Sequence, residues 1–350
     1  MILFNNPGGG SYYSFLQHAA WNGLTFADMV FPFFIFIVGA TIPFSFARRI
    51  SQGATKKKLF ALVVRRTLIL FALGLLINAF PTFDLATLRI MGVLQRIALC
   101  YFFVSIIIMY VKPKWQVILT MAILIAYWML MTLVPVPGYG AGVLTEQGNL
   151  SGYLDRLLLG SHMYAYTGTY DPEGLLSTLP ALATALIGVL AGQYLRTGVT
   201  PTAKTLKLLV IGTVSIAIGL VWNFWFPINK NLWTSSYVSA TGGIALLVLA
   251  VCFYTIDTKR YTSWTKPFTI LGLNAILIYV LSEIVNLALI FAVIPLTEDS
   301  AASLKSLIYE RLFSSWAGPL DGSFLYALAY LAFCWAVAAI LYKKRIFIKI

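Results

Sequence analysis

The feature that most constrains this chain is a series of apolar runs, each long enough to cross a lipid bilayer as a helix. A hydrocarbon core about 30 Å thick needs roughly 20 apolar residues in helical form. Nine runs reach this length, and 60% of the 350 residues are hydrophobic while only 11% are charged. A soluble domain could not bury so much apolar surface. We therefore predict an all-α, polytopic membrane bundle of about nine or ten transmembrane helices, forming one domain over residues 1–350.

The nine predicted spans differ in how clearly they are defined. They are Thr25–Ala47, Leu59–Phe80, Ile90–Val111, Trp115–Pro135, Leu175–Leu195, Leu206–Phe226, Tyr237–Ile256, Phe268–Pro295 and Phe324–Tyr342. The second is the weakest because Arg65 and Arg66 lie near its start. The run from Phe268 exceeds the bilayer thickness, which predicts a tilt or a break. Ser151–Gly160 and Ser303–Trp316 are amphipathic and are expected to lie on the membrane surface.

Basic and acidic residues are distributed unevenly between the two sides of this bundle. Alternate loops and the C-terminus carry 19 of the 25 Lys and Arg residues, and the opposite loops carry nine of the 12 acidic residues. The basic side is therefore predicted to be cytoplasmic. The net charge of +13 follows from this topology, so nucleic acid is not an expected partner. Residues 1–24 and the long loop 136–174 are then expected on the non-cytoplasmic side.

His18 stands directly in front of the first span and is one of only two histidines. An imidazole at a helix mouth is a candidate base near neutral pH, although it could merely hydrogen-bond a neighbouring loop. Asp28 lies ten residues further on and could orient the ring, as in a catalytic triad. It could also be the partner of Thr25 in a capping box. The two roles of Asp28 are compatible.

Charged residues near the ends of other spans are candidates for ligand contacts. Arg96 would be costly in lipid, so it should meet an acid or an anionic ligand, and Glu283 is a candidate partner. Asp171 and Glu173 precede another helix and are expected either to cap it or to contact a substrate.

The outer interface offers further polar and aromatic residues. Trp21 can anchor in the headgroup region, and Asn229, Lys230 and Asn231 lie between aromatic residues. An aromatic belt explains the tryptophans. The three polar residues in a row could instead bind a sugar or a pyrophosphate.

The cytoplasmic loops hold a dense basic cluster between residues 48 and 66. Ordinary positive-inside topology explains it, and docking of an anionic cytoplasmic cofactor is the alternative. Metal binding is not expected, because the sequence contains neither HExxH nor CxxC. The three cysteines lie singly within apolar runs and are expected to be small packing residues.

Taken in order, these motifs resemble the transmembrane heparan-α-glucosaminide N-acetyltransferase family, including its bacterial relatives. The matching stretches are NPGGG, HAAWNGLTFADMVFPFFIFIVG, LRIMGVLQRIALCYF, GYLDRLLLG, YDPEGLLSTLPAL, INKNLWTSSYV and LGLNAILIYV. They cover nearly the whole chain. The resemblance implies about eleven membrane helices and transfer of acetyl from cytoplasmic acetyl-CoA to an amino sugar across the membrane. For a bacterial relative it implies a multi-pass protein of the inner (cell) membrane.

The resemblance carries over three residues of the active site. His18 matches the active-site histidine, Asn6 the asparagine before the glycine run, and Asp28 the acid of the same helix. It implies that His18 is a general base or a transient acetyl carrier, that Asn6 donates to the oxyanion and that Asp28 holds the imidazole. The basic residues Arg48, Arg49, Arg65, Arg66 and Arg96 are expected to hold acetyl-CoA.

Two departures from the family pattern concern this same region. The spacing between Asn6 and His18 is one residue longer than in the lysosomal member. The helix expected before Asn6 is reduced to the stub Met1–Phe4, which predicts a truncated chain.

The expected partners are the lipid bilayer, an amino-sugar or glycan acceptor and, as a candidate, a second copy of the chain. A function from another class also stays open, namely a transporter of a small solute with His18, Arg96 and Glu283 along its pathway. Inverted repeats or paired broken helices would favour a transporter, and the sequence contains no convincing repeat.

Overall fold

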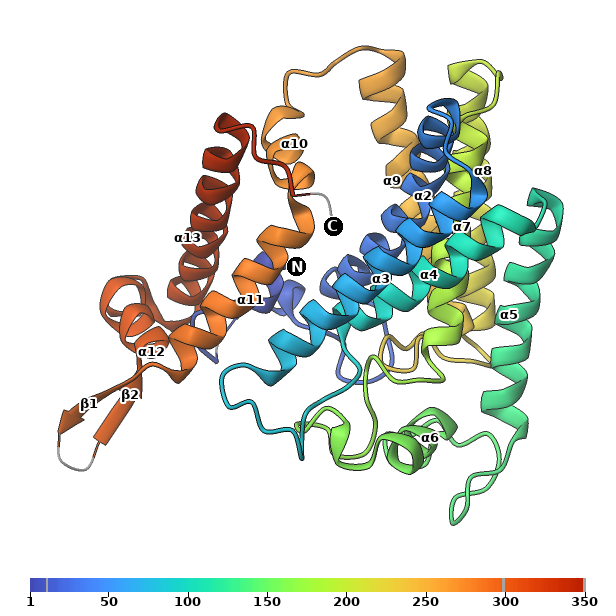
Figure 1. The fold of residues 1–350 in the computed structure, drawn as a ribbon. Coiled ribbons are helices and arrows are strands. Elements are labelled where there is room, and N and C mark those ends of the chain that lie inside the picture. Colours follow the sequence, from blue (N-terminus) through green and yellow to red (C-terminus); the bar gives the residue numbers. More distant parts are fainter. Residues whose placement is uncertain (11, 298–299, 349–350) are drawn as a thin grey trace.

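The computed structural model of the chain describes residues 1–10, 12–297 and 300–348 (Figure 1). Within these residues, eight helices are long and apolar enough to cross a membrane, or nine if one bent pair forms a single span. The predicted all-α membrane bundle is thereby confirmed. Glu298, Asp299 and Lys349, which entered the charge distribution, lie outside the described residues.

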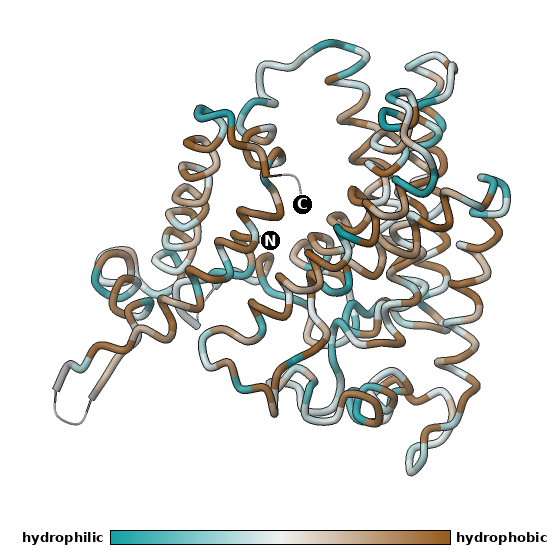
Figure 2. Tube along the Cα trace, viewed as in Figure 1, coloured by the Kyte–Doolittle hydropathy of each residue, from teal (hydrophilic) through white to brown (hydrophobic). Residues whose placement is uncertain are grey.

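Most spans begin and end within a few residues of the predicted runs. The long helices are α2 (Val30–Ser51), α3 (Lys56–Ala79), α4 (Val93–Tyr110), α5 (Pro113–Leu133), α7 (Thr178–Leu195), α8 (Pro201–Trp222), α9 (Ser235–Cys252) and α13 (Ser315–Lys343). The last begins nine residues earlier than predicted, and its backbone leaves the helical region at Gly318. Brown, apolar residues follow the spans in Figure 2, and teal residues gather at their ends.

Shorter elements connect and flank these spans. They are α1 (Ile2–Asn5), α6 (Leu150–Leu159), α12 (Leu304–Tyr309), a hairpin of β1 (Val293–Thr297) and β2 (Ser300–Ser303), 3₁₀ turns at Ser14–Leu16, Ala27–Met29 and Gly160–His162, and π turns at Phe253–Thr258 and Glu310–Ser314. The two predicted amphipathic segments correspond to α6 and to α12 with the turn that follows it.

One span is broken, as its length suggested. Helices α10 (Lys266–Leu273) and α11 (Ala275–Phe291) meet at 76°, with Asn274 between them. The Asn274 amide nitrogen donates to the carbonyl of Ile346 at 3.0 Å, and its oxygen accepts from the N–H of Ile348 at 2.9 Å. The break therefore fastens the segment that follows α13.

Helices α2 and α7 approach so closely that only glycine fits at their contact. A Cβ atom on Gly39 would lie 2.0 Å from the carbonyl oxygen of Ala185, and one on Gly188 would lie 2.1 Å from that of Phe36. Gly192, four residues after Gly188, is equally crowded. Small residues at this spacing let helix backbones touch within a membrane. The contact fixes α2, which carries functional candidates at both ends.

Helix α2 also defines two ends of the bundle. Asp28 lies in the turn just before it, and Arg48 and Arg49 lie in its last turn. Because α2 has 22 residues, these positions are about 30 Å apart. We call them the site end and the basic end. Helix α6 and the long loop lie at the site end, at the lower edge of Figure 1.

Candidate active site

Asp28 is buried, and hydrogen bonds from its own loop hold one of its two carboxylate oxygens. Its Oδ2 accepts hydrogen bonds from the backbone N–H of Ala19 at 3.1 Å, the N–H of Thr25 at 3.0 Å and the Thr25 hydroxyl at 2.9 Å. The N–H of Asp28 lies 3.4 Å from that same hydroxyl oxygen. The expected capping box is therefore present. It also fixes the direction of the second carboxylate oxygen.

That second oxygen, Oδ1, lies 2.7 Å from Nδ1 of His18. Because an ionised carboxylate only accepts, Nδ1 carries the hydrogen, and the neutral ring presents its free lone pair at Nε2. The His18 side chain is 46% exposed, whereas that of Asp28 is 1% exposed. A reachable imidazole held by a buried carboxylate is the arrangement of a general base.

Lys230 completes this group from the loop between α8 and α9. Its Nζ lies 3.1 Å from Nδ1 and 3.3 Å from Nε2 of His18, and 3.7 Å from Oδ1 of Asp28. Burial lowers the pKa of Lys230 below its ordinary value, against the opposing effect of the Asp28 and Glu173 carboxylates. We expected Lys230 at a sugar or pyrophosphate, and the structure brings it to the candidate base.

The neighbours of Lys230 hold the loop rather than point to the histidine. The amide nitrogen of Asn229 donates to Asn22 at 3.2 Å, and its oxygen accepts from the N–H of Leu232 at 2.9 Å. Asn231 is half-buried beside them. At the same end, Trp21 donates from its indole to the carbonyl of Leu144 at 2.9 Å and meets the ring of Tyr170 edge-on.

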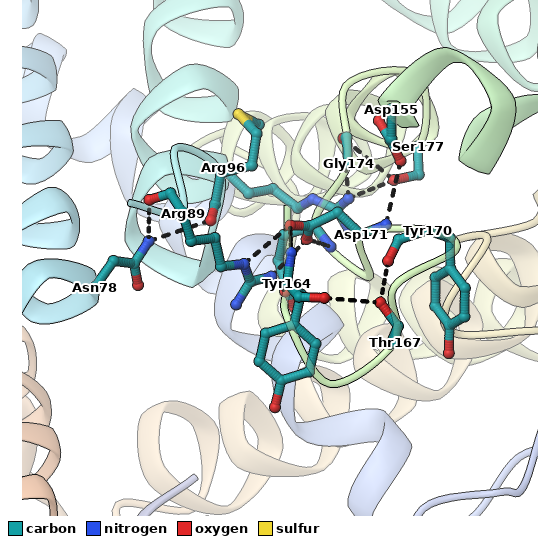
Figure 3. Close-up of polar contacts among 12 residues, drawn as sticks. Asn78, Arg89, Arg96, Asp155, Tyr164, Thr167, Tyr170, Asp171, Gly174 and Ser177 are labelled. Carbon is teal, nitrogen blue, oxygen red and sulfur yellow. Dashed lines mark hydrogen bonds and ion pairs between the residues drawn. The ribbon is translucent and has the colours of Figure 1, made fainter. Parts of the chain in front are cut away.

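Arg89 joins the two acids that were expected to cap a helix or contact a substrate, and Figure 3 shows it beside Asp171. Its Nε and Nη2 bind the two oxygens of Asp171 at 2.9 and 2.5 Å, and Nη2 also reaches Glu173 at 2.5 Å. Burial by itself lowers the pKa of Arg89 and raises that of Glu173. The ion pairs outweigh burial, so the pKa of Arg89 lies above its ordinary value and the pKa of Glu173 lies below it. We did not expect Arg89 to be the partner of these two acids. The bidentate pair shows that Asp171 and Glu173 organise this loop.

Arg96 is buried beside this network, but it has no carboxylate partner within the described residues. Its Nη2 donates to the Ser177 hydroxyl at 2.5 Å and to the Gly174 carbonyl at 3.3 Å. Its guanidinium lies 4.9 Å from the ring of Trp233. Nε and Nη1 of Arg96 are buried and find no hydrogen-bond acceptor in the described part of the chain. Two free donors in an apolar interior would suit an acceptor oxygen on a ligand.

The predicted pairing of Arg96 with Glu283 is wrong. The charged groups that act on Glu283 are Lys305 and the amino group of Met1, and Asn5 is its hydrogen-bonding neighbour. The reason is packing, because α4 lies against α3 and α7, whereas α11 lies against α3, α12 and α13. Glu283 therefore faces Lys305 and the first residues of the chain rather than Arg96.

Asn6 lies at the end of α1 and is also buried. Its amide nitrogen donates to the carbonyl of Ile2 at 2.8 Å, and its oxygen meets no hydrogen-bond donor among the residues that the structure describes. Over the part of the chain that is described, Asn6 makes no hydrogen bond to His18. Its role as an oxyanion donor stays a prediction.

The basic end contains a cavity of about 840 Å³ between α2, α3 and the broken span. Four arginines line it, Arg48 and Arg49 from α2 and Arg65 and Arg66 from α3. None of them forms an ion pair with a carboxylate in the described ranges. Four positive charges around one cavity suit an anion rich in phosphate oxygens. Ile348, whose backbone N–H donates to Asn274, also lines this cavity.

A second, narrow cavity of about 70 Å³ continues from the basic cavity into the bundle. The two cavities share Ser45, Arg66 and Ile276 as lining residues. The inner lining of the narrow cavity includes Ile97, next to Arg96. A path from the basic end towards the site end therefore begins between α2, α3 and α4.

These features define a class of protein: a polytopic membrane protein with a carboxylate-held histidine at one end and an arginine-lined cavity at the other. Residues 13–142 match a family model described as "Domain of unknown function (DUF5009)". The chain is also 34% identical to the heparan-alpha-glucosaminide N-acetyltransferase of Homo sapiens, over 340 aligned residues that cover 81% of this chain and 51% of that protein.

The protein of the same name from Mus musculus is 34% identical over 342 residues, covering 82% of this chain and 52% of its own length. The chain thus spans about half the length of the curated relatives it matches. These similarities confirm the predicted resemblance to the heparan-α-glucosaminide N-acetyltransferase family.

Proposed function

We propose that this protein is a transmembrane acetyltransferase that moves acetyl from acetyl-CoA at the basic end to an amino-sugar acceptor at the site end. The observation that carries the proposal is the His18–Asp28 pair, which supplies a base where an acceptor can reach it. The curated relatives are named as N-acetyltransferases of a glucosaminide, which supports the reaction and the acceptor class. Residues 1–350 act as one acyltransferase domain, and the segment 1–24 and the loop 136–174 frame its acceptor side.

The chemistry requires a base and a group that holds it. Nε2 of His18 removes a proton from the acceptor amine while the amine nitrogen attacks the thioester carbonyl. A C–N bond forms, the C–S bond breaks, and CoA leaves as a thiol after taking the proton from His18. Asp28 holds the ring in the tautomer with a free Nε2 and stabilises the imidazolium. In the alternative route Nε2 attacks first and carries the acetyl group transiently.

The developing oxyanion needs a donor, and Asn6 is the residue that the family resemblance assigns. A single donor of this kind typically contributes about 3 kcal/mol to transition-state stabilisation. At the acceptor side, Trp21, Asn229 and Asn231 form part of the loops around His18, while Asp171 and Glu173 stiffen the wall through Arg89.

The arginine-lined cavity is the proposed site for the charged end of acetyl-CoA. Arg48, Arg49, Arg65 and Arg66 provide donors and charge for phosphate oxygens there. The free N–H groups of Arg96 would meet a carbonyl oxygen of the arm that reaches inward. We place the basic end in the cytoplasm of a bacterial cell, where acetyl-CoA is made, and with it the C-terminus.

The proposal is tested with His18→Ala in liposomes that contain acetyl-CoA and face glucosamine outside. We expect N-acetylglucosamine formation, followed by mass spectrometry, to fall at least 100-fold, since a positioned base contributes about 10²–10⁴. His162→Gln is the matched control, because the His162 ring donates to a loop carbonyl, that of Leu88, at 2.8 Å. Undiminished transfer by a folded His18→Ala protein would overturn the assignment.

For the transporter alternative, paired broken helices would be the expected feature, and the described residues contain one bent pair, α10 and α11. A direct discriminator is the thermal midpoint of unfolding with and without CoA. A ligand present at 100 times its Kd stabilises the folded state by about 2.7 kcal/mol, and a transporter of small solutes would not respond to CoA.

A further inference from the structure

We infer that Lys230 is a positioning residue for His18: its ammonium lies against the imidazole face, leaves Nε2 free, and opposes addition of a second proton to the ring. The inference rests on the proposed function, because it assigns Lys230 to the base of that same reaction. It replaces the expected role of Lys230 as a sugar or pyrophosphate ligand.

The distances fix where the ammonium lies. Nζ is 3.1 Å from one ring nitrogen and 3.3 Å from the other. In the plane of the ring, a position this close to both nitrogens would overlap ring carbons. Nζ therefore lies above the ring face. The lone pair of Nε2 points outward in the ring plane, so the ammonium does not occupy it, and Nε2 stays available to an acceptor.

The charged groups around His18 act in opposite directions. Asp28 accepts from Nδ1 at 2.7 Å and favours the imidazolium. Lys230 opposes it from above the ring face, with its side chain 19% exposed and its ammonium 3.7 Å from Asp28. Glu173 acts on Lys230 and favours its charged form. From α9, the Tyr237 hydroxyl donates to the backbone carbonyl of Asp28 at 2.5 Å and brings no charge.

This balance suits a base that must both take up a proton and release it. A carboxylate alone would stabilise the imidazolium and slow the transfer of its proton to the leaving thiolate of CoA. The ammonium beside the ring destabilises the imidazolium, so the proton passes on more readily. A unit charge about 3 Å away changes a protonation midpoint by about one pH unit even at the dielectric constant of water.

The test uses the fact that the chain has only two histidines. In the His162→Gln background, full-length protein labelled with ¹⁵N-histidine in lipid nanodiscs gives NMR signals from one histidine. Replacing Lys230 by Met removes the charge and keeps much of the side-chain volume. We expect the His18 titration midpoint to rise by about one pH unit in Lys230→Met. Lys230→Arg, which keeps the charge, should stay close to the parent protein.

Lys114→Met is the matched control, since Lys114 is exposed at the start of α5, and it should not move the midpoint. An unchanged or lowered midpoint in Lys230→Met would overturn the inference. If Lys230→Met does not fold, Lys230→Gln, which also removes the charge, takes its place, and an unchanged or lowered midpoint in that variant contradicts the inference.

Acetyl transfer separates this inference from the proposed function. With Lys230→Met, the acidic limb of the pH–rate profile should move up by about one unit, while KM for acetyl-CoA stays unchanged. If the parent protein transfers no acetyl group to an amino sugar, the proposed function fails, although the NMR result still stands. If His18→Ala is inactive and Lys230→Met has the parent profile and midpoint, only the role of Lys230 fails.

Discussion

Replacing Asp28 by Asn is expected to abolish catalysis while leaving the fold almost intact. In the native protein Oδ2 accepts three hydrogen bonds from Ala19 and Thr25, and Oδ1 faces Nδ1 of His18. The single oxygen of Asn would keep the loop donors, so its NH₂ group would face His18. A donor would then meet the Nδ1 hydrogen, and the ring would move its hydrogen to Nε2.

The size of the loss follows from this change of tautomer. With the hydrogen on Nε2 the ring cannot accept the proton of the acceptor, and the corresponding exchange in a serine protease triad lowers kcat by about 10⁴. Stability should change much less, since one hydrogen bond to a charged group contributes about 1.5–3 kcal/mol. We therefore expect a fall in kcat of about 10³–10⁴ for Asp28→Asn with only a modest decrease in Tm.

The assay is acetyl transfer to glucosamine in proteoliposomes, with the Tm of each variant measured in the same detergent. Asp84→Asn is the matched control, because exposed Asp84 also caps its own loop, accepting from Ala86 at 3.0 Å and Thr87 at 2.7 Å. It should retain full activity. If folded Asp28→Asn keeps more than a tenth of the parent rate, the tautomer argument is refuted.

Two further predictions concern the helix contact and the basic cavity. Gly188→Ala should lower Tm, since the new methyl group would lie 2.1 Å from the Phe36 carbonyl and overpacking costs about 1–3 kcal/mol; Gly198→Ala, in open space, should not. The double variant Arg48→Gln with Arg49→Gln should bind acetyl-CoA about 100-fold more weakly by calorimetry, since charge-assisted bonds to phosphate contribute on the order of 1.5 kcal/mol each and two are lost; unchanged affinity would leave topology as the only reason for these charges.

The sequence predicts best what is local or periodic. The spans follow from runs of about 20 apolar residues, and the break at Asn274 follows from a run that is too long for the bilayer. The His18–Asp28 pair joins residues only ten positions apart, around a helix start that the capping pattern of Thr25 already marks. In each case a short stretch contains all the information.

Contacts between distant segments could not be predicted in the same way. Arg89 and Asp171 are 82 residues apart, and Lys230 and His18 are 212 apart. An apolar helix gives little indication of which face meets which neighbour, because lipid and protein interior are equally apolar. The wrong Arg96–Glu283 pairing arose there: both charges required a partner, and only the structure shows that Arg96 donates to Gly174 and Ser177 while Lys305 acts on Glu283.

The narrow cavity inside the bundle has a consequence for the membrane as an electrical barrier. Its volume of about 70 Å³ leaves room for only a few water molecules, and the charged side chain of Arg66 lines it together with the apolar Ile42, Leu70 and Ile97. A continuous water column between the basic cavity and His18 would let protons flow down the membrane potential. A fixed positive charge beside so small a cavity repels protons, which favours electrical insulation between the two ends of the bundle.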